Sequence, residues 1–259
     1  MILAVDIGNT ETVIGLFDDL DPVRTWRLAT DPKRTADEIA LTLSGLLAAA
    51  DVDGYESPER LVIASVVPVL NRSWAGAGDR LGAGTEFLTG TSPIPIRLDV
   101  ERPAEVGADR IANTLAAATL FEANTIVVDL GTATTFDCIS AEGVFLGGVI
   151  APGPLALDQL TRATAQLPKV ELSAPSRVIG RNTLDCLRSG GFYTVVDGID
   201  GIVRRILDEW EPEAPMVAAT GGLAEVVGRH CRTVERIEPA LTITGLAIAD
   251  RYLSGEVTL

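Results

Sequence analysis

The feature that constrains the fold of this chain most is a short pattern that occurs twice. Residues 2–10 read ILAVDIGNT and residues 126–134 read IVVDLGTAT, so an apolar run ends both times in Asp-Ile-Gly or Asp-Leu-Gly. The two aspartates, Asp6 and Asp129, stand 123 residues apart in a chain of 259, which is close to half its length. Repetition at this spacing predicts two related halves.

Both copies are followed by a similar succession of predicted elements. Two further β-type runs come first, and then helical patterns, of which one begins at Thr35 and Glu38 with the spacing of a capping box. In the first half we also expect strands at 60–67 and 86–89 and helices at 68–81 and 106–123. In the second half we expect helices at 153–164, after the turn 180–183, around 199–210 and at 241–253, and a strand at 216–220. This order predicts an α/β protein with mixed sheets.

The composition narrows the classes of partner and cofactor. With 21 Lys plus Arg against 36 Asp plus Glu the formal charge is −15, and such a surface repels phosphate backbones, so no nucleic-acid partner is expected. The two lysines, Lys33 and Lys169, lie outside any Walker-type phosphate loop. The single His and three scattered Cys do not have the spacing of a four-ligand zinc site.

No segment of the sequence predicts a membrane location. The first residues lack the basic region and longer apolar run of a signal peptide, and no run approaches the ~18–20 apolar residues that cross a bilayer. The odd number of cysteines fits a reducing compartment. We therefore expect a soluble, cytoplasmic protein with no membrane partner.

The first copy of the pattern has the chemistry of a phosphate-binding turn. Gly8 permits a tight turn in which backbone N–H groups approach a phosphate, and Asn9 and Thr10 add side-chain donors. The Asp6 carboxylate, at the end of a buried strand, is suited to hold Mg²⁺ beside that phosphate. Taken alone, the segment is more typical of an ordinary β-hairpin.

The second copy and a later glycine turn favour nucleotide binding. Asp129 supplies another carboxylate, followed by a glycine and several hydroxyls, Thr132 among them. Two loops of this kind are expected to form a two-sided clamp for a nucleotide polyphosphate. Gly221 and Gly222 follow a predicted strand and would let an adenosine approach the backbone. The three elements in this order are far more specific than any one of them.

These elements resemble the phosphate-1, phosphate-2 and adenosine motifs of the actin/hexokinase/Hsp70 ATPase superfamily. Within it, residues 103–113 (PAEVGADRIAN) look like the signature of the type III pantothenate kinases. Residues 147–153 (GGVIAPG), 180–183 (GRNT) and 241–246 (LTITGL) are similar to further blocks of that family. The blocks span almost the whole chain in the order that the family has.

The resemblance implies a fold and a reaction. The fold would have two actin-like (ribonuclease H-like) halves with mixed sheets flanked by helices. Residues 1–118 would carry the phosphate-1 loop and the pantothenate motif, and residues 119–259 the phosphate-2 loop and the adenosine motif. The implied activity is ATP-dependent 4′-phosphorylation of pantothenate, a transferase reaction that begins coenzyme A synthesis. The family forms homodimers with substrate pockets at or near the subunit interface, and the same is expected here.

The resemblance also implies roles for individual residues. The ATP contacts would be Asp6, Ile7, Gly8, Asn9, Thr10, Glu11, Thr12, Val13, Thr132, Gly221 and Gly222. Pantothenate would bind among Val100, Gly107, Ala108, Asp109, Arg110 and Thr183. Mg²⁺ would be held with ATP at Asp6, and a monovalent cation, K⁺ or NH₄⁺, at Asp129.

Phosphoryl transfer to an alcohol needs a carboxylate that takes the hydroxyl proton and cations that offset phosphate charge. Asp109, near the start of a predicted helix, is the best candidate for this base. Arg110 beside it would keep the carboxylate ionised at neutral pH, or pair with the substrate carboxylate or a phosphate oxygen. Without the resemblance, the pair would read as a helix-start acid and an ordinary surface arginine.

Three positions depart from the family pattern. Val100 stands where the family usually has a substrate-contacting Tyr, Arg102 where it has Asn, and Arg181 where it has Lys. A lost Tyr hydroxyl removes a hydrogen bond worth about 0.5–1.5 kcal/mol, which changes affinity more than reaction class. Two alternatives stay open: a binding or regulatory protein without catalytic activity, and a superfamily kinase or phosphatase for another small anion.

Overall fold

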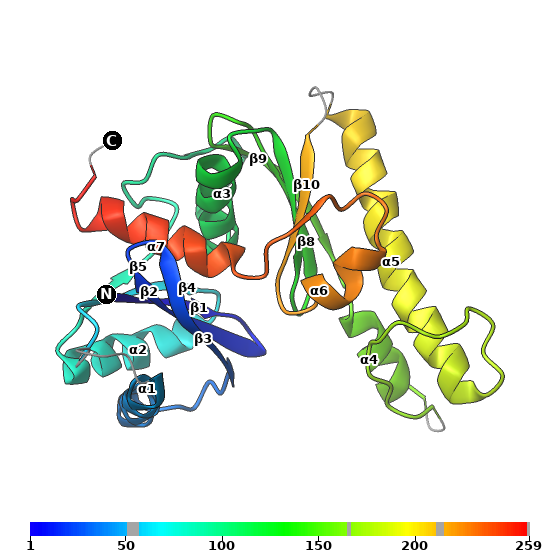
Figure 1. The fold of residues 1–259 in the computed structure, drawn as a ribbon, viewed down its shortest axis with the longest axis horizontal. Coiled ribbons are helices and arrows are strands. Elements are labelled where there is room, and N and C mark those ends of the chain that lie inside the picture. Colours follow the sequence, from blue (N-terminus) through cyan, green and yellow to red (C-terminus); the bar gives the residue numbers. More distant parts are fainter. Residues whose placement is uncertain (51–56, 165–166, 211–214, 258–259) are drawn as a thin grey trace. The chain divides into compact units, whose positions relative to one another are not determined.

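The structure of the chain is a computed structural model that describes residues 1–50, 57–164, 167–210 and 215–257. The chain divides into two units (Figure 1). The first consists of Met1–Thr119 together with Leu241–Leu259, and the second of Leu120–Ala240. The C-terminal segment thus returns to the unit in which the chain begins, whereas the sequence placed it in the second half.

A five-stranded sheet in the order β3-β2-β1-β4-β5 forms the centre of the first unit. Strand β1 is antiparallel to β2 and parallel to β4. The strands are β1 (Ile2–Ile7), β2 (Glu11–Asp18), β3 (Asp21–Ala29), β4 (Arg60–Ser65) and β5 (Gly84–Phe87). The helices are α1 (Ala36–Ala50), α2 (Pro68–Leu81), α3 (Ala108–Phe121) and α7 (Leu241–Leu253), with a 3-10 turn at Pro103–Glu105 and a short strand β6 (Arg97–Leu98).

The second unit repeats this topology. Its strands are ordered β11-β10-β7-β8-β9, with β7 antiparallel to β8 and parallel to β10. They are β7 (Thr125–Leu130), β8 (Thr134–Ile139), β9 (Val144–Ala151), β10 (Met216–Thr220) and β11 (Arg236–Ile237). The helices are α4 (Leu155–Arg162), α5 (Thr183–Glu209) and α6 (Ala224–Val227), with a 3-10 turn at Gly228–His230. Since β7 takes the place of β1 and β10 that of β4, the prediction of two related α/β halves is confirmed.

Apolar runs explain why the central strands are buried in both units. In the first unit, Leu3 and Val5 of β1 pack against Ile39 and Leu43 of α1 and Trp74 of α2. Helix α7 contacts β1, β2 and β4, and Figure 1 shows it on the face of the sheet opposite α1 and α2. A strand covered on both faces needs an apolar sequence, which β1 has from Ile2 to Val5.

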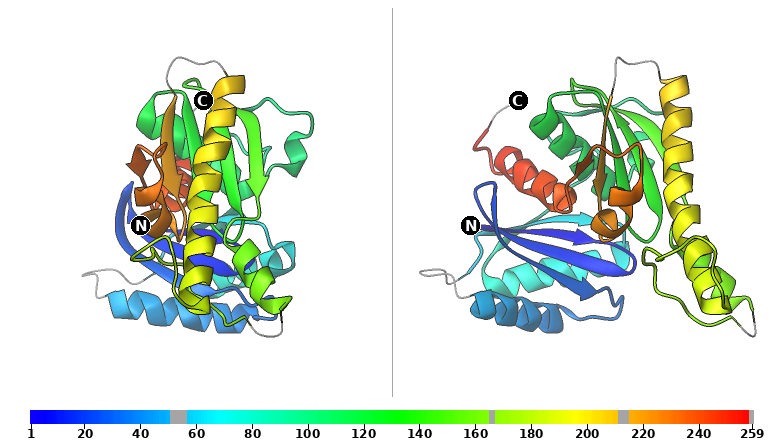
Figure 2. Two further views of the ribbon diagram at one scale, coloured as in Figure 1. Left: turned by 90° about the vertical axis from the view of Figure 1, so that its right-hand side faces the viewer. Right: turned by 45° about the vertical axis from the view of Figure 1, so that its right-hand side comes forward.

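One long helix covers the sheet of the second unit (Figure 2). Phe192, Ile199 and Val203 of α5 pack against Ile126 and Val128 of β7. The sequence suggested two helices here, but the structure has a single helix of 27 residues. Its glycines, such as Gly198, interrupt the helical pattern in sequence without breaking the helix. Among the described residues, no helix combines the length and the apolar character that crossing a bilayer requires.

Candidate active site

The first sequence pattern forms the hairpin between β1 and β2. Asp6 is half-buried at the end of β1, in register with Val13. The Gly8 N–H donates to the Glu11 carbonyl at 3.0 Å, and a Cβ on residue 8 would lie 2.9 Å from that oxygen. Only glycine fits this turn, and it leaves Asn9 and Thr10 exposed at its tip, as a phosphate-binding loop requires.

Other expected ATP contacts have structural roles in this hairpin. Ile7 and Thr12 are buried, and the Thr12 hydroxyl lies 2.8 Å from the hydroxyl of Thr30. Glu11 forms an ion pair with Arg27 on β3. These three side chains therefore hold the hairpin in shape, and the exposed tip is the part of it open to a ligand.

Asp109 occupies the first turn of α3. Its Oδ1 accepts a hydrogen bond from the Arg110 N–H at 2.8 Å, and a Cβ on residue 107 would lie 2.3 Å from the same oxygen. Gly107 is thus required so that the carboxylate can fold back over the start of the helix. The arrangement fixes the position of this carboxylate oxygen at the start of the helix.

The environment of Asp109 differs from the sequence-based expectation. Burial raises the pKa of its carboxyl group above the ordinary Asp value, and this effect outweighs the lowering by the Arg110 N–H and guanidinium. Arg110 lowers the pKa of Asp109, in the direction expected from the sequence, but burial has the larger effect. A raised pKa suits a general base, because the carboxylate then binds a proton more strongly.

A short chain of contacts joins Asp109 to the Asp6 hairpin within the first unit. The Val66 N–H donates to the Ile7 carbonyl at 3.1 Å, next to Asp6. The Val66 side chain lies 3.5 Å from the Cβ position of Gly107, at the turn that carries Asp109. The structure thus brings the candidate base and the phosphate-1 loop to the same end of the sheet.

The block at 241–246 acts by supporting α3. A Cβ on Gly245 would lie 2.1 Å from the Ala112 carbonyl oxygen, so α7 and α3 approach as closely as a glycine permits. The Thr242 hydroxyl donates to the Asn113 amide oxygen at 2.8 Å, and both residues are buried. Residues 108–113 and 241–246, distant in sequence, form one helix–helix contact that positions Asp109. The sequence signal for this contact was Gly245, a glycine inside a helical pattern.

Two positions that depart from the family pattern lie ahead of α3. Val100 is half-buried, and Arg102 is exposed and pairs with Glu105 at 3.0 Å. Because that ion pair lies within the turn itself, the Arg102 charge already has a partner. Ala108, another expected pantothenate contact, is buried at the start of α3.

In the second unit, Asp129 meets the glycine turn that follows β10. Gly221 has φ +90°, and a Cβ there would lie 2.4 Å from Asp129 Oδ1. The Leu223 N–H donates to the Leu130 carbonyl at 3.2 Å, which ties the turn to the end of β7. The predicted phosphate-2 and adenosine elements are therefore neighbours in the structure. Thr132 and Gly222 are exposed beside them.

Two buried hydroxyls near Asp129 have no hydrogen-bond partner among the described residues: those of Thr134 and Thr220. Thr220 is in register with Asp129 on the neighbouring strand, so both side chains point to the same face of the sheet. Sequence reasoning placed Thr220 in the adenosine turn and gave it no role toward a cation. Buried polar groups usually have a partner, and an oxygen without one beside a carboxylate suits a cation.

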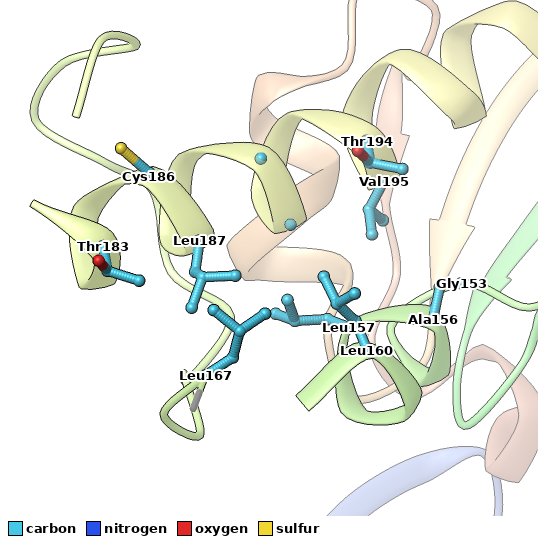
Figure 3. A pocket seen from close by; sticks show the side chains of 12 residues that line it. Gly153, Ala156, Leu157, Leu160, Leu167, Thr183, Cys186, Leu187, Thr194 and Val195 are labelled. Carbon is cyan, nitrogen blue, oxygen red and sulfur yellow. The ribbon is translucent and has the colours of Figure 1, made fainter. Parts of the chain in front are cut away.

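Thr183 is the first residue of α5. The Asn182 side chain caps this helix by accepting from the Asp185 N–H at 2.9 Å, as the turn 180–183 predicted. Thr183 is exposed at one end of an apolar cavity of about 470 Å³ between α4 and α5 (Figure 3). Leu157, Leu160 and Leu187 project into this cavity. Thr183 belongs to the second unit, whereas Gly107–Arg110 belong to the first.

Comparison with known families agrees with these features. A family model described as type III pantothenate kinase matches residues 2–205. The chain belongs to the type III pantothenate kinase family. Relatives named type III pantothenate kinase include those of Acidothermus cellulolyticus, 45% identical with 96% of this chain and 97% of that protein covered. Another, from Pelobacter propionicus, is 38% identical with 96% and 98% covered. The chain is accordingly a kinase by family.

Solved structures with similar folds are more distant in sequence. A ROK family glucokinase from Streptomyces griseus, solved with glucose and AMPPNP, has a TM-score of 0.53 at 13% identity, over 95% of this chain and 98% of that one. Component A of (R)-2-hydroxyglutaryl-CoA dehydratase from Acidaminococcus fermentans has a TM-score of 0.57 at 14% identity, over 98% of both. These similarities agree with the actin/hexokinase-like fold of the family.

Proposed function

We propose that this chain catalyses the ATP-dependent phosphorylation of pantothenate, the reaction of its family, with Asp109 as the general base. The observation that carries the assignment is the Asp109 carboxylate, which is fixed above Gly107 at the end of the sheet where the Asp6 hairpin lies. There the carboxylate takes the proton of the attacking hydroxyl as the oxygen–phosphorus bond forms and ADP leaves. The product is 4′-phosphopantothenate, on the route to coenzyme A.

The phosphate groups of ATP are assigned to both repeated loops. The hairpin 6–13 offers backbone N–H groups and the exposed Asn9 and Thr10 side chains, and the second loop offers the exposed Thr132. Gly221 and Gly222 are assigned to the adenosine. The tight turn at Gly8 supports this assignment, because it leaves the tip of the hairpin uncovered.

The residues present suit two cations. Asp6 would hold Mg²⁺ together with the ATP phosphates, which is the usual way in which Mg²⁺ combines few carboxylates with substrate oxygens. Among the described residues no cluster of three His, Cys, Asp or Glu forms a metal site. Asp129, with the Thr220 hydroxyl on the same face, would hold the monovalent cation. Such cations supply positive charge that offsets charge on the phosphates.

Pantothenate is assigned to the segment around α3 and to Thr183. Arg110 is half-buried beside Asp109 and is suited to the substrate carboxylate, since a guanidinium binds a carboxylate through two parallel hydrogen bonds. Gly107, Ala108 and Val100 would shape the pocket. With Val100 in place of a tyrosine, we expect weaker binding of pantothenate, with the same reaction.

A homodimer is proposed on the apolar surface of the second unit. Large apolar side chains remain exposed there, among them Ile179 at 82% and Ile150 at 66%. Others in the same unit are Leu155, Leu160, Val178 and Leu184. Exposed apolar side chains that form a contiguous patch mark an interface, and we propose that these do so. Light scattering is expected to give a mass twice that of the chain, which is 27.3 kDa. The variant Ile179→Asp should shift the measured mass toward that of a single chain. Val69→Asp, which changes an exposed apolar residue of the first unit, is the control and should leave the mass unchanged.

The deciding experiment is a coupled assay of ADP release with and without pantothenate, in K⁺ and in Na⁺, with the product identified by mass. ADP release that depends on pantothenate and is faster in K⁺ supports the proposal. Folded protein that binds ATP and pantothenate without forming product would assign it to the binding or regulatory alternative. ADP release driven by another small anionic alcohol would assign it to the other kinase alternative.

A further inference from the structure

A basic cavity lies on the first unit, outside the residues assigned to ATP and pantothenate. Its volume is about 500 Å³, and it is lined by the segment 32–36, which leads into α1, and by one side of α2. Four of its nine lining residues carry a positive charge: Lys33, Arg34, Arg72 and Arg80. No acidic residue of the described part of the chain lines it, although the chain carries 15 negative charges in excess.

Three of these four charges have no ion-pair partner among the residues that the structure describes. Arg80 pairs with Asp37 and also donates to the Gly76 carbonyl at 2.7 Å. Lys33, Arg34 and Arg72, by contrast, form no salt bridge with any residue in the described part of the chain. Like charges gathered around one cavity repel each other, and a bound anion removes that repulsion.

The side chains, not the helix end, provide the binding groups. The start of α1 is already capped, because the Glu38 carboxylate accepts from the Thr35 N–H at 2.8 Å and the Glu38 N–H donates to the Thr35 hydroxyl at 3.3 Å. Arg34, Arg72, Lys33 and Ser73 line the cavity, and their guanidinium, ammonium and hydroxyl groups are the donors available to an anion. Guanidinium forks suit phosphate oxygens, and the ammonium adds a point charge.

We propose that this cavity is a second anion site that binds a small oligophosphate, an anion with at least two linked phosphate groups. A single phosphate group carries about −1.5 to −2 at pH 7, less than the three positive charges of Lys33, Arg34 and Arg72 that have no ion-pair partner among the described residues. A compact oligophosphate, of which inorganic pyrophosphate is the simplest, offers enough negative oxygens for all of them. The volume of about 500 Å³ accommodates such an ion.

The site is connected to the phosphate-1 hairpin. The Thr30 N–H, three residues before Lys33, donates to the Thr10 carbonyl at 2.9 Å, and the Thr30 hydroxyl lies 2.8 Å from that of Thr12. A ligand that orders the segment 32–36 therefore acts on the loop that supports the hairpin.

The test is a titration of the full chain with inorganic pyrophosphate. Calorimetry gives the number and affinity of sites, and NMR of the arginine Nε–Hε groups identifies the side chains involved. We expect saturable shifts of the Arg34 and Arg72 signals. Arg72→Gln and Arg34→Gln should each weaken this site at least tenfold. Arg24→Gln is the matched control, because Arg24 is exposed in the same unit, outside the cavity, and donates to the neighbouring Val23 carbonyl.

Two results would overturn the proposal. In the first, pyrophosphate binds equally strongly to all three variants and leaves the Arg34 and Arg72 signals unmoved. All binding would then lie elsewhere, for example at the ATP loops. Orthophosphate or citrate binding to the cavity as tightly as pyrophosphate would reject an oligophosphate as its ligand.

Discussion

At the scale of single residues, the proposed chemistry depends on how the protein surrounds Asp109. Replacing it with Asn keeps the shape and the hydrogen bond from the Arg110 N–H but removes the proton acceptor. We expect Asp109→Asn to bind ATP normally and to lose about 10²–10⁴-fold in turnover. The exposed Asp79→Asn is the control. Turnover of Asp109→Asn within a few-fold of the parent would remove Asp109 from the role of base.

The raised pKa of Asp109 also predicts a stability effect. A group whose pKa is higher in the folded than in the unfolded chain lowers stability as pH rises above the unfolded value of about 3.9. Asp109→Asn has no carboxyl group to ionise and so avoids this loss of stability. Its melting temperature near pH 7 should therefore exceed that of the parent protein, and the difference should shrink as the pH is lowered. Thermal melts between pH 4 and pH 8 measure this. A variant that melts lower at pH 7 would contradict it.

Gly221 gives a second prediction at this scale. An added methyl group would lie 2.4 Å from Asp129 Oδ1 on a residue with φ +90°, so it must displace the carboxylate or strain the backbone. We expect Gly221→Ala to destabilise the chain by about 1–3 kcal/mol and to weaken ATP binding. Gly198→Ala on α5, where a methyl group meets nothing within 4 Å, should be neutral or stabilising. Denaturant unfolding and nucleotide titration of both variants test this.

At the scale of elements, the contact between α3 and α7 decides where Asp109 lies. Gly245→Ala forces a methyl group against the Ala112 carbonyl, and we expect a loss of about 1–3 kcal/mol together with lower turnover, because α3 must move. Gly45→Ala in α1 meets open space and should leave both unchanged or raise stability. Equal melting temperatures and rates for the two variants would show that α3 tolerates the displacement.

Elements with local signals were predictable, and those set by distant contacts were not. The capping box at Thr35 and the cap at Asn182 were readable because the partners are three residues apart. The continuity of α5 was hidden by its glycines, which lower helix propensity while the helix is stabilised by packing on β7. The contact of Thr242 with Asn113 joins residues 129 positions apart, which no local pattern reveals.

At the scale of the whole molecule, the chain end is fixed to the first sheet by a charge pair. Arg60 of β4 donates to both carboxylate oxygens of Asp250 in α7, at 2.7 and 2.6 Å, and Asp250 is 3% exposed. We expect Arg60→Met to cost about 3–5 kcal/mol, because it leaves a buried charge without a partner. Arg60→Met/Asp250→Leu should recover most of this.

The control for that prediction is Arg229→Met, which removes an exposed pair with Glu225 at 3.4 Å and should change stability by less than about 1 kcal/mol. Urea unfolding of the three variants and the parent measures the differences. A loss in Arg60→Met as small as that in Arg229→Met would mean that α7 is held by its apolar contacts alone.

Residues close together in the chain were enough to predict the two repeated strand–turn patterns and most of the succession of elements, because strand and turn signals are local. The tertiary structure decided the rest. It returned α7 to the first unit, set Gly221 against Asp129, brought Gly107 beside Val66, and raised the pKa of Asp109 by burial. Each of these depends on atoms contributed by separate segments, and such contacts, unlike hydrophobic period or turn chemistry, leave no local trace in the order of the residues.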